Sequence, residues 1–309
     1  MNGNGQIEKP EEKVFQLNTE TSTDDLLSQL SIKKRFNNTG IQIERAKKLM
    51  LHISLFVLTC LATWYVGGLW YAVAIMTILT AHEMGHYLMC RKYKIKVTLP
   101  FFIPFPLRDF NPFGTLGAVI KIGERLPTRK AIFDVGITGP LSGLFFTIPA
   151  LIIGLRLSAV AETSRIDPGI FHLGESFLFA QLSRWIIGDI PDGYELMLHP
   201  VAYAGWVGLF VTALNLLPIG QLDGGHVMYA LFGSKSEIVF KIMLAIFSII
   251  SAIFYPGWLL FIIMIIIVGY RHPPAVYSNT KINPKRVVIG YLTFIIFVLS
   301  FTPVPFYFT

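Results

Sequence analysis

Long apolar stretches alternate with short polar segments from residue 49 onward. A transmembrane helix needs roughly 20 predominantly apolar residues. Seven stretches approach or reach this length, namely 49–67, 69–90, 131–157, 199–217, 237–254, 257–270 and 287–306. Pro256 and Gly257 can either turn the chain back between the fifth and sixth stretches or kink one long helix. The pattern therefore predicts an all-α polytopic membrane protein with six or seven transmembrane helices.

One segment departs from this pattern. Residues 97–123 read VTLPFFIPFPLRDFNPFGTLGAVIKIG, in which prolines and aromatic residues give way to the alternation of a β-strand in GTLGAVIKI. Extended backbone at membrane depth requires protein or a water-filled cavity to satisfy its polar groups. We interpret the segment as a re-entrant or interfacial β-hairpin beside a site. The alternative is a cytoplasmic hairpin without a functional role.

The distribution of charge predicts an orientation. Basic residues gather before the first stretch (Lys33, Lys34, Arg35, Arg45, Lys47, Lys48) and between the second and third (Arg91, Lys92, Lys94, Lys96, Arg108, Lys121, Arg125, Arg129, Lys130). Residues 161–198 instead carry two basic and six acidic side chains. Because cytoplasmic loops are enriched in Lys and Arg, the first two regions should be cytoplasmic and the third outward-facing. Seven crossings would also place a third basic group on the cytoplasmic side, namely Arg271, Lys281, Lys285 and Arg286, whereas six would not. We therefore favour seven crossings, with the C-terminus outward.

The same reading divides the chain into three parts. Residues 1–48 are polar, with a short helical signal at Thr23–Leu30, and predict a flexible cytoplasmic tail. Residues 49–270 form the expected membrane domain, and residues 271–309 a cytoplasmic loop followed by a final transmembrane helix.

The amino-acid composition indicates a protein whose surroundings are a lipid bilayer. Hydrophobic residues make up 53% of the 309-residue chain and charged residues 15%. The net charge of +7 is spread among the connections instead of lying on one face, which argues against nucleic acid. Cys60 and Cys90 lack a CxxC spacing, so neither a disulfide framework nor a thiolate metal site is expected.

The second apolar stretch contains the sequence TAHEMGHYLMC. His82 and His86 lie one helical turn apart on one face, where two imidazoles can bind one zinc ion, and Glu83 can reach a metal-bound water. Ionisable groups within an apolar span are costly and are functional by default. The pattern predicts a zinc site of the HExxH kind, with Glu83 as general base and then general acid.

A catalytic zinc keeps three protein ligands and one open position. The best third candidate is Asp223 in NLLPIGQLDGGH, where Pro218 and several glycines interrupt the fourth stretch and predict a broken helix. A carboxylate at such a break can point into the protein. His226 is the competitor, as a ligand, as a hydrogen-bond partner of a ligand, or as a histidine facing water.

Together the two motifs resemble the site-2 protease family of intramembrane metalloproteases, peptidase family M50. The resemblance covers roughly Leu49 to Tyr270 and includes TGPLSG at 138–143, whose small residues we assign to close helix packing. No segment is long enough for the PDZ domain of some members, so the chain is most similar to the PDZ-less branches. The resemblance implies that His82, His86 and Asp223 bind zinc and that Glu83 is the base.

The resemblance further implies that Asn215 lies near the reacting carbonyl and that the strand around 114–120 pairs with the substrate. The expected activity is hydrolysis of membrane-spanning proteins at a site towards the cytoplasmic side. Homo-oligomerisation is left open. One alternative is an inactive chaperone or scaffold of the same fold. The intact set of His82, Glu83, His86 and Asp223 argues against it. The other alternative is a metal-ion transporter, which should show an internal repeat that we do not find in the sequence.

Overall fold

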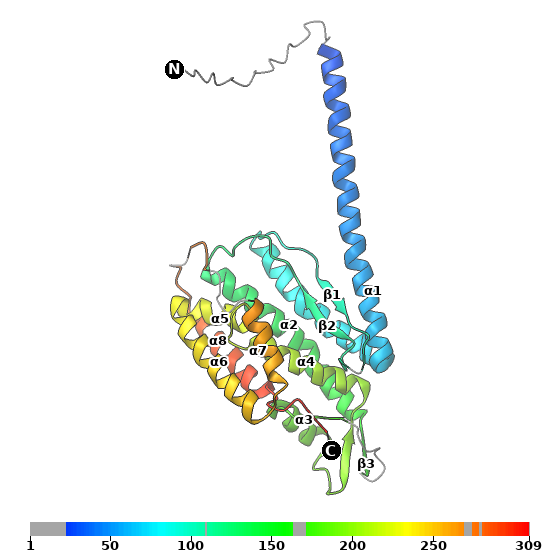
Figure 1. The fold of residues 1–309 in the computed structure, drawn as a ribbon, viewed down its shortest axis with the longest axis vertical. Helices are drawn as coiled ribbons and strands as arrows, with labels where there is room; N and C mark the ends of the chain where they lie inside the picture. Colours follow the sequence, from blue (N-terminus) through cyan, green and yellow to red (C-terminus); the bar gives the residue numbers. More distant parts are fainter. Residues whose placement is uncertain (1–22, 109, 163–170, 269–273, 278–279, 309) are drawn as a thin grey trace, which may run out of the picture. The chain divides into compact units, whose positions relative to one another are not determined.

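The chain is mainly helical in a computed structural model that describes residues 23–108, 110–162, 171–268, 274–277 and 280–308. The helices are α1 (Thr23–Lys92), α2 (Arg129–Arg156), α3 (Phe177–Ile187), α4 (Pro200–Leu216), α5 (Asp223–Phe232), the 3-10 turn η2 (Gly233–Lys235), α6 (Ser236–Ile253), α7 (Trp258–Val268) and α8 (Pro284–Ser300). The strands are β1 (Phe101–Pro104), β2 (Thr115–Val119), β3 (Ala159–Glu162), β4 (Phe171–Leu173), β5 (Tyr194–Met197) and β6 (Phe306–Phe308). Figure 1 shows the arrangement.

Helix α1 contains a sharp turn at Gly68, whose φ of 80° is outside the helical region. Glycine adopts this conformation at little cost because it has no Cβ. The turn separates the first two predicted apolar stretches, as the sequence indicates. The start of α1 corrects an expectation: the helix is continuous from Thr23, whereas we expected at most a short helix in a flexible tail. Residues 31–48 contain no proline, so none of them lacks the backbone N–H that the helix needs.

Each of the seven apolar stretches overlaps a described helix, and the first two are the parts of α1 before and after Gly68. Three helical segments in the described part of the chain are long and apolar enough to cross a membrane, namely Gln42–Lys92, Arg129–Arg156 and Asp223–Ile253. Shorter apolar helices cover Phe177–Ile187, Pro200–Leu216 and Trp258–Ile267. Helices α6 and α7 pack against each other across Pro256 and Gly257, so the chain turns back at this point.

Helix α2 packs along α4 and α5. Its C-terminal half contacts the start of α4, since a Cβ added at Gly154 would collide with the backbone of Ala202. Its N-terminal half contacts the start of α5, where Gly136 lies against Asp223 and His226. Helices α4 and α5 therefore act as one broken helix alongside α2, as the sequence predicts.

The break between α4 and α5 follows from Pro218. A residue before proline disfavours the helical region, and Leu217, with φ −52° and ψ 127°, leaves the helix. The new helix begins at Asp223 after Leu222 in an extended conformation. Gly224 and Gly225 pack so closely against the carbonyl groups of Leu216 and Gly220 that neither has space for a Cβ.

Residues 97–123 contain a β-hairpin, and its re-entrant or interfacial position stays a prediction. Strands β1 and β2 pair antiparallel, with Phe101 opposite Val119 and Phe102 opposite Ala118, and a further bridge joins Val97 to Ile122.

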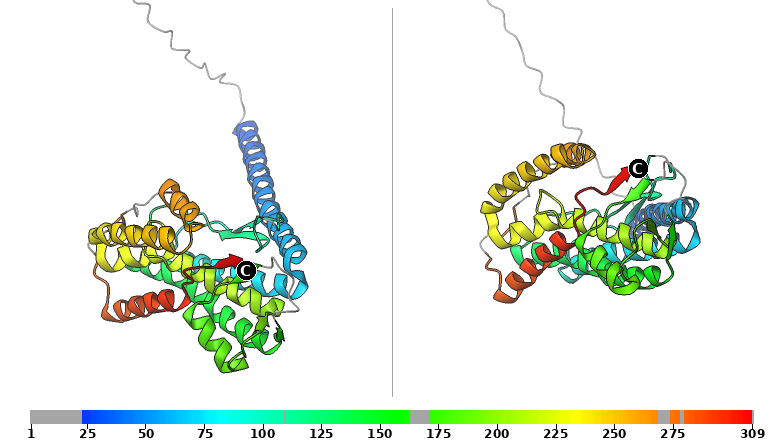
Figure 2. Two further views of the ribbon diagram at one scale, coloured as in Figure 1. Left: turned by 60° about the horizontal axis from the view of Figure 1, so that its bottom comes forward. Right: turned by 90° about the horizontal axis from the view of Figure 1, so that it is seen from below.

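The sequence did not predict the elements of the 161–198 connection. They are α3, capped by Ser176, and the strands β4 and β5. Strand β5 pairs antiparallel with β3 at the start of the connection, and β4 pairs antiparallel with β6. Because β6 follows α8, the end of the described chain lies beside this connection (Figure 2). Residues from His52 onward form one compact unit, so α8 and β6 belong to the same unit as α2 and α4.

Candidate metal centre

His82 and His86 lie on the second half of α1, where both side chains are buried. The helical spacing of four residues brings the rings to a centroid distance of 4.9 Å. Their Nε2 atoms are 3.2 Å apart and face the same point. The two imidazoles thus offer a pair of nitrogen ligands from one helix face.

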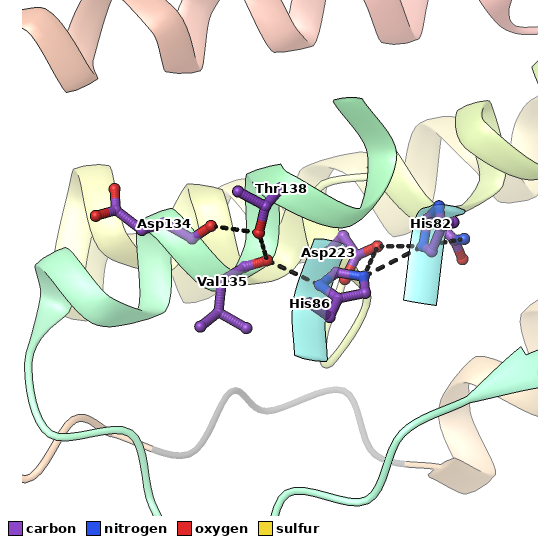
Figure 3. Close-up of polar contacts among 7 residues, drawn as sticks. His82, His86, Asp134, Val135, Thr138 and Asp223 are labelled. Carbon is purple, nitrogen blue, oxygen red and sulfur yellow. Dashed lines mark hydrogen bonds and ion pairs between the residues drawn. The ribbon is translucent and has the colours of Figure 1, made fainter. Parts of the chain in front are cut away.

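Asp223 approaches this point from the first turn of α5. Its Oδ2 atom lies 3.3 Å from Nε2 of His82 and 3.2 Å from Nε2 of His86 (Figure 3). The break after α4 makes this approach feasible because it lets a helix start, with its side chain pointing inward, at the depth of the histidines. The structure therefore brings together three side chains from two segments that are 137 residues apart.

The three atoms have the spacing that a tetrahedral zinc site requires. Ligands at 2.0–2.1 Å from a tetrahedral ion lie about 3.3–3.4 Å from one another, and the observed separations are 3.2, 3.2 and 3.3 Å. Two imidazole nitrogens and one carboxylate are also the donor set of many zinc enzymes. The residues fit a divalent metal ion, and zinc in particular.

A backbone carbonyl of α2 orients His86. Nδ1 of His86 lies 2.8 Å from the carbonyl oxygen of Val135, which places the proton on Nδ1 and leaves the Nε2 lone pair for a metal. The ring has access to this carbonyl because Gly139, one turn further along α2, carries no side chain; a Cβ there would overlap the imidazole. The packing interpretation of TGPLSG is confirmed, since Gly143 is likewise against His82.

Glu83 and Asn215 border the same site. Both line a cavity of about 220 Å³ together with the three candidate ligands. Glu83 is 7% exposed. Nδ2 of Asn215 lies 3.3 Å from Nε2 of His82. All five residues singled out from the sequence are therefore in one place.

The free edge of β2 forms one wall of this cavity, which Ala118, Val119 and Ile120 line. Beyond β2, both the N–H and the C=O of Lys121 bond to Thr98 on the β1 side. Successive residues of an extended chain direct their backbone groups to opposite sides. The N–H and C=O of Ile120 therefore point away from β1 and towards the cavity.

A second cavity, of about 590 Å³, adjoins the first. The two share Ile120, Ile122, Gln221 and His226 as lining residues, and the second extends along Lys121–Leu126. His226 thus lies between the two cavities. The group of residues able to hold a metal comprises His82, His86 and Asp223 among the described residues, and His226 is outside it.

Sequence reasoning left Asp134 without a role. In the structure its carboxylate accepts two hydrogen bonds from Arg286, both at 2.7 Å, and one from the Tyr93 hydroxyl at 2.6 Å. Burial, with the contact to Asp134, raises the pKa of Tyr93 to about 12, so the phenol stays protonated and donates at neutral pH. Neither this cluster nor the Val135 carbonyl has a motif that reveals it.

Comparison with known proteins agrees with the site. The family model of peptidase family M50 matches residues 70–255. The chain is 30% identical over 244 residues to the probable zinc metalloprotease EGY2, chloroplastic, of Oryza sativa subsp. indica, which covers 77% of this chain and 43% of that protein. It is 29% identical over 253 residues to the Arabidopsis thaliana EGY2, covering 78% and 43%. The chain thus spans less than half the length of these relatives.

Proposed function

The chain belongs to peptidase family M50, and we propose from this membership and from the metal centre that it is a zinc-dependent endopeptidase acting on membrane-spanning proteins. The observation that carries the proposal is the meeting of His82, His86 and Asp223, whose ligand atoms lie 3.2–3.3 Å apart with Glu83 at the same cavity. The proposed ligands are these three side chains. Zinc, when bound, lowers the pKa of a coordinated water and polarises a carbonyl group.

Glu83 is the proposed general base. It accepts a proton from the attacking water as the new C–O bond forms, and it delivers that proton to the amide nitrogen as the C–N bond breaks. Its side chain is buried and lines the same cavity as Ala118, Val119 and Ile120. Asn215 is proposed to donate from Nδ2 to the oxygen of the scissile carbonyl, where negative charge develops.

The proposed substrate is an extended stretch of a membrane-spanning chain. A transmembrane helix hides its carbonyl groups in intrahelical hydrogen bonds, so the stretch that is cut must first unwind. The free edge of β2 offers the unwound stretch new partners by strand addition, and Ile120 directs its backbone groups to the cavity where that stretch would lie.

We further propose seven crossings with the N-terminal tail and the metal centre towards the cytoplasm. Three contacts join the start of α2, the end of α5 and the start of α8. They are Thr128 with Tyr277, Arg129 with Ala230, and Asp134 with Arg286. At the other end of α8, β6 pairs with β4 in the connection between α2 and α4. These contacts support a chain that crosses twice between α5 and α8, through α6 and α7.

The basic connections 93–128 and 280–286 then lie on one face, which the positive-inside rule makes cytoplasmic. His86 precedes Tyr93 by seven residues, which is about 10 Å along a helix, so the metal centre lies nearer this face. The 590 Å³ cavity beside residues 121–126 is the proposed route for water.

Replacement of Glu83 by Gln tests the activity directly. The amide keeps the size of the side chain but cannot accept the proton, so cleavage of a single-span test substrate by the purified protein should fall by at least about 100-fold. Zinc content should stay near one equivalent because Glu83 is not a proposed ligand.

The matched control is Glu237→Gln on α6, an exposed carboxylate paired with Lys241, which should cleave like the parent. Equal turnover of Glu83→Gln and the parent would refute the role of Glu83. No cleavage by the parent, at full zinc content, would favour the scaffold alternative.

A further inference from the structure

The carboxylate of Asp134 joins three elements at the proposed cytoplasmic end of the fold. Arg286 at the start of α8 contacts it with Nε to Oδ1 and Nη2 to Oδ2, and Tyr93, directly after α1, donates to Oδ2. The side chains of Asp134 and Arg286 are only 13% and 20% exposed. Two parallel hydrogen bonds from a guanidinium fix both the distance and the angle of the carboxylate, as a lysine could not.

Asp134 precedes Val135, whose carbonyl oxygen holds Nδ1 of His86. Two successive residues of α2 thus make contacts with the α1 segment: Val135 with His86 on the helix, and Asp134 with Tyr93 directly after its end (Figure 3 shows the contact of Val135 with His86). Thr138 adds a hydrogen bond from Oγ1 to the carbonyl oxygen of Asp134 at 2.8 Å. The turn of α2 that orients the histidine is therefore the turn that the ion pair anchors.

Helices α1 and α2 approach each other closely at two glycines. A Cβ added at Gly85 of α1 would come within 2.5 Å of the carbonyl oxygen of Thr138 on α2, and one added at Gly139 would overlap the His86 ring. Glycine contacts of this kind allow close approach but do not select a register, because a smooth surface can slide. A directional contact is needed to set the position of α2 along α1.

We propose that Asp134, Tyr93 and Arg286 are positioning residues of the metal centre. They hold the Val135 carbonyl in line with Nδ1 of His86, so that Nε2 of His86 points at the metal. The inference rests on the proposed zinc site, and it couples α8, which contributes no candidate ligand, to metal binding. Loss of a hydrogen-bond partner behind a metal ligand typically weakens metal affinity by about 10- to 100-fold.

The test measures zinc affinity of the full chain in detergent, by competition with a chromophoric chelator, for the parent and for Asp134→Asn, Arg286→Lys and Tyr93→Phe. We expect about tenfold weaker binding for Asp134→Asn, a smaller loss for Arg286→Lys, which keeps the charge but not the paired hydrogen bonds, and about threefold for Tyr93→Phe. The matched control is Asp189→Asn in the exposed pair with Arg184, which should bind zinc like the parent.

Thermal unfolding of the metal-free proteins separates positioning from simple stability. An Asp134→Asn protein that unfolds at a lower temperature but binds zinc within twofold of the parent would overturn the inference. If Asp134→Asn does not fold, the zinc affinities of Tyr93→Phe and Arg286→Lys test the inference instead. Parental zinc affinity in both variants would also overturn the inference. A parent protein that binds no zinc above background would instead refute the proposed function.

Discussion

At the residue scale, the three candidate ligands of the metal centre contact one another within an apolar surrounding. Burial of an ionisable group between apolar helices is unfavourable unless other groups compensate it. His86 meets this condition at Nδ1, whose N–H donates to the Val135 carbonyl, and this leaves the lone pair of Nε2 facing Asp223 at the proposed metal position. The side chain is thereby oriented through Nδ1, which is the condition for a ligand of defined direction.

The choice between Asp223 and His226 as third ligand is testable. We expect Asp223→Ala to lower the zinc content of the purified protein below about half an equivalent, because a site with two imidazoles alone binds weakly. His226→Ala should retain about one equivalent, since His226 lies outside the group of potential ligands. Metal analysis after dialysis measures both. The reverse result, with zinc lost only from His226→Ala, would make His226 the ligand.

At the element scale, the site depends on two interruptions of regular structure. The break between α4 and α5 places Asp223 at a helix start, and the free edge of β2 leaves backbone groups beside the cavity unpaired with β1. If α4 and α5 were one continuous helix, residue 223 would lie further along the helix axis. If another strand covered β2, its edge would not be available to a substrate. Both features put polar backbone where a cavity can use it.

Strand addition to β2 predicts a pattern in the substrate. An added strand directs every second N–H towards its partner, so methylation of alternate backbone nitrogens near the scissile bond should reduce cleavage at least tenfold. Methylation of the intervening nitrogens should have little effect. Semisynthetic single-span substrates with one N-methyl group each, assayed for initial rate, provide the measurement. A loss of rate that does not alternate along the sequence would exclude pairing with β2.

At the scale of the whole molecule, contacts gather at the two ends of the helices. One end holds the Asp134 cluster and the bridge between Thr128 and Tyr277, and the other holds the pairing of β4 with β6. With seven crossings every one of these contacts joins segments on the same side of a membrane. With six crossings the last helix would run in the opposite direction and β6 could not reach β4.

Thiol labelling tests this topology. In a variant whose Cys60 and Cys90 are replaced by Ser, single cysteines at Val276 and Tyr307, both exposed in the structure, should react with a membrane-impermeant reagent from opposite faces. A cysteine at Asp192 should behave like the one at Tyr307, because both line one cavity of the β4, β5 and β6 region. Labelling of positions 276 and 307 from the same face would contradict seven crossings.

Zinc removal should destabilise the whole fold, because the proposed ligands join α1 to α5. A ligand that binds only the folded state stabilises it by about 4 kcal/mol at a free concentration 1,000 times its Kd. We therefore expect a chelator to lower the unfolding temperature of the purified protein by several degrees, and added zinc to restore it. Asp223→Ala should show no such shift. An unchanged parental unfolding temperature would mean that the ion does not link the two helices.

Local sequence patterns predicted the apolar helices, the separation of the first two at residue 68, the hairpin in residues 97–123, the break before Asp223 and the resemblance to the family. Each of these depends on local chemistry: the length of an apolar run, the conformational freedom of glycine, the effect of proline on the preceding residue, and the four-residue spacing of two histidines. Local chemistry also misled at the N-terminal region, where polar composition suggested a short helix but α1 is continuous from Thr23.

For Asp223, already the best third candidate from the sequence, the structure added the approach to 3.2–3.3 Å from the two histidines. Packing of the chain was needed to show that the Val135 carbonyl orients His86 and that Asp134 binds Arg286 and Tyr93. It also brought β6 to β4. A carbonyl group is present in every residue and a lone Asp or Arg carries no motif, so the sequence contains no local signal for these pairs. Their identity depends on which helix faces lie together, and that follows from packing of the entire chain.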